Sequence, residues 1–311
     1  MKQKQFEITS LNFLKGMCCI SVILLHCSIP GRMGRLIVDF LRFPVPCFFM
    51  ISGYFSKNAK EFYKSKITVT VKYLIFSETF SAAIFAIFRP DIYADQVQKI
   101  TSLSLLKMIE TIFSGTFFNG TLWYLYAVLW SWIILMLFSE RKYTLKIEAL
   151  TILVLLSIQI VGGIYFQKQS QIDQIIWCFR SAILYGVPFI LIGQNIRKYE
   201  KEILDFLSLD RLYLFLGFMG CIAVLEYKLL KVYTDVYLST VGISILLFTL
   251  ALHYKKSIIN KFVYYIGKEL SGNIYLIHYP CIVFCERYVW GGVHMVKSLE
   301  HCYYLLEWRG V

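Results

Sequence analysis

The sequence predicts an all-α integral membrane protein, a polytopic bundle of about nine to ten transmembrane helices. Hydrophobic residues make up 58% of the 311 residues and charged residues only 17%, whereas a soluble domain is about 45–50% apolar and about 25% charged. Apolar runs of about 20 residues, the length that crosses a bilayer as a helix, recur along the whole chain. Lysine and arginine are concentrated in alternate connections between these runs, as in multi-pass membrane proteins.

We expect one transmembrane domain over residues 1–290 and a divergent or truncated C-terminal tail over 291–311, which contains no apolar run of spanning length. The predicted spans are roughly 11–29, 36–56, 67–88, 121–139, 147–166, 177–195, 211–230, 236–254 and 271–290. Basic residues gather in the connections 57–66, 141–146, 197–211 and 255–268. These connections are therefore expected on the inner side of the cell (plasma) membrane, with the N-terminus cytoplasmic.

The net charge of +12 does not indicate a nucleic-acid partner. The basic residues lie in short loops between apolar runs, and their distribution reflects which loops face the inner side of the membrane. Nine cysteines are present without a Cys-x-x-Cys pair. Metal sites need characteristic ligand spacing, so we expect the cysteines to form no disulfide and no metal site. We also expect no bound cofactor. The partner expected from composition is the lipid bilayer.

The first span contains two ionisable residues, Lys15 and His26, eleven positions apart. Eleven steps of 100° return a helix to within about 20° of its starting face, about 16 Å further along its axis. Lys15 alone is compatible with a snorkelling residue at the inner interface, and His26 alone with a hydrogen-bonded packing residue. Their common face favours a shared cavity, because ionisable groups inside a membrane usually mark a functional site.

The second span contains Asp39 and Arg42, and its predicted direction places Arg42 near the depth of His26. Asp39 lies one turn before Arg42, so a purely structural ion pair is the alternative to a functional role. Pro44 and Pro46 interrupt the helix directly after Arg42. Such a break frees backbone carbonyl groups, which are tolerated in a membrane only inside protein or against a watery cavity.

Other polar or small residues extend this candidate cavity. They are Ser52, Gly53 and Tyr54 at the end of the second span, Glu78, Trp123, Arg180 and Glu226 in later spans, and Ser271, Tyr275 and His278 in the last one. The last three follow i, i+4 and i+7 spacing and share a helical face. Trp123 is equally compatible with an interfacial aromatic belt. Glu78 and Glu226 are the acidic residues that we considered as counter-charges for the arginines.

Five motifs in order resemble the membrane acyltransferase 3 family. They are Lys-x10-His in the first span, FLRFPVPCFFMISGYF, LWYLYAVLW, RSAILYGVPFILIGQNI and YYIGKELSGNIYLIHYP, together covering about residues 9–280. The family's basic residues after Ser-Gly-Tyr have only a loose match here, Lys64, Lys66 and Lys72. A single motif is a weak signal, but five in the same order are specific.

The resemblance implies an O-acyltransferase that moves acetyl from acetyl-CoA to a hydroxyl of a cell-envelope sugar or polysaccharide precursor. We expect Lys15, Lys64 and Lys66 to attract the phosphates of the donor. His26 would accept the hydroxyl proton or carry the acyl group itself. Arg42, with Arg180, would stabilise negative charge on the carbonyl oxygen.

The alternative is a transporter or flippase of an envelope lipid or sugar. Transporters also contain charged residues in their spans and proline-broken helices. Acyl transfer from a labelled donor separates the two classes.

Overall fold

The computed structural model describes residues 8–26, 31–114, 117–139, 143–169, 176, 178–232, 234–256 and 260–288. Within these ranges the chain is helical and contains no strand, which confirms the predicted all-α class. The predicted C-terminal tail, 291–311, lies outside the described residues. The helices of the N-terminal half are α1 (Thr9–His26), α2 (Gly31–Phe40), α3 (Pro44–Tyr54), α4 (Lys60–Phe88), α5 (Pro90–Thr101), α6 (Leu105–Ser114) and α7 (Trp123–Phe138).

The second half continues with helices that are interrupted by short π-helical turns. They are α8 (Leu145–Ser157) and α9 (Gly163–Lys168), α11 (Val187–Lys198), α12 (Glu200–Phe206), α13 (Leu209–Leu230), α14 (Leu238–His253), α15 (Lys261–Tyr265) and α16 (Ser271–Tyr288). π-helical turns lie at Ile158–Gly162, Ala182–Gly186 and Ile266–Leu270. The first joins α8 to α9, the second precedes α11, and the third joins α15 to α16.

Six helical segments of the described chain are long and apolar enough to cross a membrane, so the expected nine to ten spans are not confirmed. They are 9–26, 37–54, 60–88, 120–138, 145–168 and 209–230, and α14 is a shorter apolar helix. The span expected at 177–195 differs because Ser181 has an extended backbone and caps the turn at Ala182. α16 differs because polar residues such as Asn273 and His278 lower its apolar character.

The second predicted span is split where its prolines predict a break. α2 ends at Phe40, the chain turns over residues 41–43, and α3 begins at Pro44. Proline is well suited to this first helical position because its missing N–H would have no partner there. Arg42 therefore lies in a turn between two helices and is 6% exposed.

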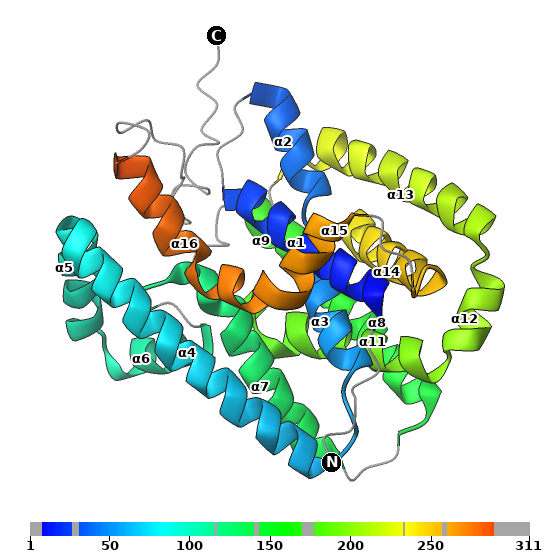
Figure 1. Ribbon diagram of the computed structural model, residues 1–311, viewed down its shortest axis with the longest axis horizontal. Coiled ribbons are helices and arrows are strands. Elements are labelled where there is room, and N and C mark those ends of the chain that lie inside the picture. The colour runs from blue at the N-terminus through cyan, green and yellow to red at the C-terminus, as the bar shows by residue number, and fades with distance from the viewer. Residues whose placement is uncertain are drawn as a thin grey trace.

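The core of the molecule lies around α3 and α11, which pack closely against each other (Figure 1). A Cβ atom at Gly53 would lie 2.1 Å from the carbonyl oxygen of Ile190, and one at Gly193 would lie 2.1 Å from that of Met50. Only glycine at both positions lets the two backbones approach this closely. α11 is therefore the helix that α3 contacts through Gly53.

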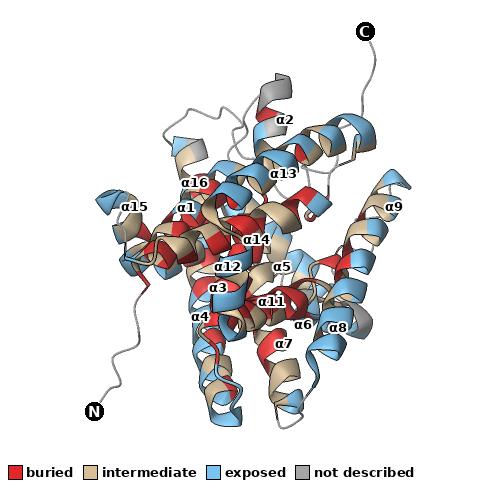
Figure 2. Ribbon diagram, turned by 90° about the vertical axis from the view of Figure 1, so that its right-hand side faces the viewer, coloured by how far each residue is buried: buried red, intermediate tan, exposed pale blue. Residues whose placement is uncertain are grey.

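The periphery consists of helices whose side chains are largely exposed. Figure 2 shows buried residues concentrated on α1, α3, α11 and α14, and exposed residues along α8 and α13. In the spans 145–168 and 209–230 only 11% of the most apolar 18-residue stretch is buried inside the protein. An apolar helix that is exposed in this way is suited to contact lipid. Buried polar residues lie on several of the inner helices, among them Thr70, Ser77 and Ser81 on α4 and Ser239, Thr240, Ser244 and Thr249 on α14.

We predict that Gly53→Ala destabilises the protein, because the added methyl group would overlap the backbone of α11. Overpacking of this kind costs typically about 1–3 kcal/mol. The measurement is the thermal unfolding midpoint of the purified protein in detergent. Gly217→Ala in α13 is the matched control, since a Cβ there meets nothing within 4 Å. An unchanged midpoint for Gly53→Ala would contradict the close contact.

Candidate functional site

Two adjoining cavities lie inside the bundle. The large cavity has a volume of about 530 Å³ and lies between α1, α3, α4, α7 and α16. The small cavity has a volume of about 90 Å³ and is lined by residues of α1, α3, α7 and α16 together with Arg42, Arg180 and Asp235. Phe48, Tyr124 and Tyr275 line both cavities and separate them.

Two helices, α3 and α16, each contribute side chains to both cavities. On α3, Ser52 lines the large cavity, Phe48 lines both, and Val45 lines the small cavity. On α16, Ser271 lines the large cavity, Tyr275 both, and His278 the small one. Spacings of three and four residues put each set on one helical face, and the sequence predicted this common face for the set on α16.

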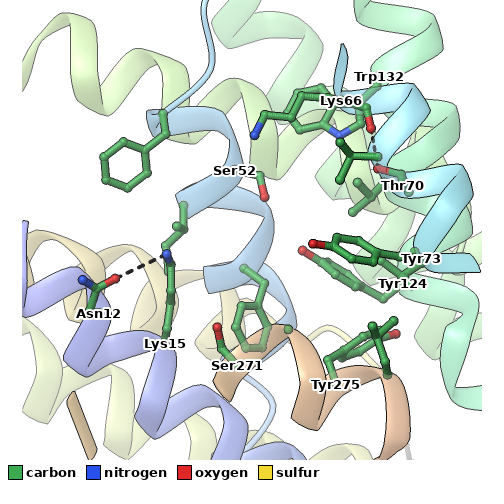
Figure 3. Close-up of a pocket in the computed structure, with 18 of the residues that line it drawn as sticks. Asn12, Lys15, Ser52, Lys66, Thr70, Tyr73, Tyr124, Trp132, Ser271 and Tyr275 are labelled. Atoms are coloured by element: carbon green, nitrogen blue, oxygen red, sulfur yellow. Dashed lines mark hydrogen bonds between the residues drawn. The ribbon is translucent and has the colours of Figure 1, made fainter. Parts of the chain in front are cut away.

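Lys15 and Lys66 are the cationic side chains that line the large cavity. Figure 3 shows Lys15 extending from α1 and Lys66 from α4, on different walls of the cavity. Lys15 Nζ donates to Asn12 Oδ1 at 3.4 Å and lies 5.9 Å from the ring centre of Phe55. Lys66 Nζ lies 5.3 Å from the ring centre of Phe62. The large cavity therefore combines apolar walls with two ammonium groups.

A largely buried ion network lines the small cavity, with the side chains of Arg42, Arg180 and Asp235 6%, 13% and 18% exposed. Arg180 donates to Asp235 through Nε at 2.7 Å and Nη2 at 3.2 Å. Arg42 donates to the same carboxylate through Nη1 at 3.3 Å, and its Nε lies 3.6 Å from Asp39 Oδ1. Arg180 also lies over the ring of Trp123, 5.3 Å from its centre. Two guanidinium groups are thus paired with two carboxylates.

Asp235 remains ionised in this network. Burial by itself would raise the pKa of its carboxyl group, but the guanidinium groups of Arg180 and Arg42 outweigh that effect and hold the pKa below its ordinary value. Asp235 follows α13 and precedes α14, in a connection between two helices. Its pairing explains how two arginines are accommodated at a depth where an unpaired charge is costly.

Two histidines lie beside each other at the small cavity. The ring centres of His26 on α1 and His278 on α16 are 5.2 Å apart. His278 Nδ1 lies 2.8 Å from the carbonyl oxygen of Tyr275 and 3.1 Å from that of Ile274. Because carbonyl oxygens only accept, Nδ1 carries the proton in neutral His278 and Nε2 presents a lone pair. Nε2 is buried and has no hydrogen-bond partner among the described residues.

The remaining predicted residues divide into two groups. Ser52 and Ser271 line the large cavity, Trp123 the small one, and Tyr275 both. Gly53, Tyr54 and Lys64 are absent from both linings. Tyr54 donates to Glu200, and Lys64 is 53% exposed and pairs with Glu61 at 2.9 Å. Of the three lysines assigned to the donor, Lys64 therefore lies away from the cavities.

Asp235, Phe48 and Tyr124 are site residues that were not singled out from the sequence. Glu78 and Glu226, the acidic residues that we considered as counter-charges, have other partners. Glu78 accepts from the Phe118 amide at 3.0 Å, and Glu226 accepts from the first amides of α14. Asp235 lies 193 residues from Arg42 and 55 from Arg180. The one feature near Asp235 in the sequence that could have pointed to it is its position, as an acidic residue in the connection before a predicted span.

The described residues contain no group of three or more histidine, cysteine, aspartate or glutamate side chains that could hold a metal ion.

A family model described as an acyltransferase domain, that of acyltransferase 3, matches residues 8–300. This match covers nearly the whole chain, including both cavities. Comparison of the chain with curated proteins and with solved structures gave no match.

We predict that Asp235→Asn strongly destabilises the protein, because the guanidinium groups of Arg42 and Arg180, which are 6% and 13% exposed, would lose their common counter-charge. Removing one partner of a buried ion pair costs about 3–5 kcal/mol. Asp91→Asn is the matched control, since Asp91 is 54% exposed in its pair with Arg89, and exposed pairs contribute about 0–1 kcal/mol. Thermal unfolding in detergent should show a much larger fall for Asp235→Asn. Equal small effects would contradict a structural role of the network.

Proposed function

Since this chain belongs to the acyltransferase 3 family, and so is a membrane acyltransferase, we propose that it transfers an acetyl group from acetyl-CoA to a hydroxyl of a cell-envelope sugar or polysaccharide precursor. The observation that carries the proposal is the pair of adjoining cavities. One contains two lysines, and the other contains two histidines beside two arginines. Donor binding and chemistry are thereby assigned to neighbouring spaces.

The donor is proposed to enter the large cavity. Its phosphates are strongly anionic, and Lys15 and Lys66 line this cavity. The distribution of lysine and arginine among the connections supports a cytoplasmic position for the Lys15 end of α1, and acetyl-CoA is made in the cytoplasm. The apolar walls suit the pantetheine arm, and the eleven residues from Lys15 to His26 cover about 16 Å along α1. An arm extended along this face brings the thioester toward the small cavity.

The small cavity is proposed as the place of transfer. The acceptor hydroxyl oxygen attacks the thioester carbonyl carbon, and its proton passes to a ring nitrogen of His26. The carbon–sulfur bond then breaks, and the departing thiolate takes the proton from His26. The Nε2 lone pair of His278 offers a second proton acceptor in the same space.

The arginines are proposed to stabilise the negative charge that develops on the carbonyl oxygen. Arg42 and Arg180 line the small cavity, and both are held in position by Asp235. Preorganised donors of this kind need no reorganisation when the charge forms. Their positive charge is offset by Asp39 and Asp235, so their contribution comes from directed N–H groups rather than from an excess of charge.

A second route assigns a different order of bond changes to His26. Its ring nitrogen can attack the thioester first, so that the acyl group is carried on His26 before it passes to the acceptor. Incubation with labelled acetyl-CoA in the absence of acceptor separates the two routes. Label retained on the wild-type protein, and lost in a His26 variant, would indicate the acyl-carrier route.

We predict that His26→Ala lowers acetylation of the acceptor in membranes by at least about 100-fold, the range of general acid–base catalysis. The comparison is normalised to the amount of folded protein. His253→Ala is the matched control, since His253 contacts the Leu207 carbonyl oxygen at 2.7 Å and lines neither cavity. Activity of His26→Ala near that of the wild type would overturn the assignment of His26. A protein that binds the donor without any transfer or hydrolysis would favour a transporter.

We predict that Lys15→Gln and Lys66→Gln each raise KM for acetyl-CoA about tenfold or more, with a smaller change in kcat. A charge-assisted hydrogen bond to phosphate is worth about 1.5–3 kcal/mol, which corresponds to this range. Lys64→Gln is the matched control because Lys64 is exposed and pairs with Glu61. A normal KM for both cavity variants would show that the donor binds elsewhere.

A further inference from the structure

Three aromatic side chains form a partition between the two cavities. Phe48 comes from α3, Tyr124 from α7 and Tyr275 from α16, and each lines both spaces. The ring centres of Phe48 and Tyr124 are 6.0 Å apart, and those of Tyr124 and Tyr275 are 5.2 Å apart. Figure 3 shows Tyr124 and Tyr275 beside each other at the cavity wall. Any group that moves from one cavity to the other must pass these rings.

Two members of the partition are held in place by several contacts. The Tyr275 hydroxyl donates to the Thr121 carbonyl oxygen at 2.6 Å. Tyr124 shares a side-chain hydrogen bond with Ser52, and its ring meets Phe49 edge-on at 4.6 Å between centres. These contacts fix both rings from two directions.

Phe48 differs from the two tyrosines because its side chain has no polar atom and forms no hydrogen bond. All three rings are half-buried, so rotation about their side-chain bonds meets less packing than in a fully buried ring. The hydrogen bonds of Tyr124 and Tyr275 oppose such rotation, whereas no hydrogen bond holds Phe48. Phe48 is therefore the member of the partition that sets the size of the passage.

The small cavity has little room beyond the partition. Its volume of about 90 Å³ compares with about 530 Å³ for the large cavity. Arg42, Arg180 and Asp235 also line it, and an apolar chain would displace hydration from these groups without replacing it. A short acyl group fits this space, whereas each further methylene must push against packed side chains.

We propose that the partition of Phe48, Tyr124 and Tyr275 selects short acyl groups, with Phe48 as the principal determinant of chain length. This inference rests on the proposed function, because it assumes that the thioester passes from the large cavity to the small one. It assigns specificity to residues that touch the donor and that take no part in proton transfer.

The test compares acetyl-CoA with hexanoyl-CoA on the purified full-length protein in detergent. The readout is release of the CoA thiol, with water in place of the acceptor. The wild type should release CoA from acetyl-CoA at least tenfold faster than from hexanoyl-CoA. Phe48→Ala should lower this ratio at least tenfold, and Phe48→Leu should lower it by a smaller factor. Phe48→Leu decides the result if Phe48→Ala yields no folded protein.

Phe62→Ala is the matched control, because Phe62 lines the large cavity and not the small one. It should leave the ratio of the two donors at the wild-type value. An unchanged ratio in both Phe48 variants, or a wild type that uses the two donors equally, would overturn the chain-length role and leave the acyltransferase intact. A wild type that releases CoA from neither donor would overturn the proposed function, and this inference with it.

Discussion

Burial of two guanidinium groups is the constraint on which the rest of this structure depends. An arginine inside a membrane protein needs a counter-charge, since an uncompensated charge there costs at least a few kcal/mol. Asp235 supplies it to Arg42 and Arg180 together, from a connection that follows α13. The turn before α3, the segment before α11 and the connection before α14 are thereby held at one point. The small cavity lies beside that point because these three segments converge there.

Close backbone packing determines which side chains reach the cavities. Gly53 and Gly193 let α3 and α11 touch through their backbones, and this contact orients α3 about its axis. One face of α3 then passes the large cavity at Ser52, the partition at Phe48 and the small cavity at Val45. α16 presents Ser271, Tyr275 and His278 in the same order. Two helices therefore connect a cationic space with a space that contains histidines.

Features that depend on one helix could be predicted from the sequence. The common face of Ser271, Tyr275 and His278 follows from helix periodicity, and the break near Arg42 follows from Pro44. Contacts between distant segments could not be predicted in this way. Glu78 and Glu226 were as plausible as counter-charges as Asp235, because no local pattern tells which acidic residue meets an arginine. Lys64 and Lys66 lie only two positions apart, yet helix rotation directs just one of them into the cavity.

The sequence by itself determined the all-α membrane class, the family, and the order of polar groups along each helix. These properties depend on composition, on motif order and on a periodicity that the backbone geometry imposes locally. Only the tertiary structure decided that Asp235 joins two arginines, that the interior is divided into a large and a small cavity, and that Phe48, Tyr124 and Tyr275 separate them. The physical reason is that these features depend on how helices rotate and approach one another, which is set by packing between segments far apart in the sequence.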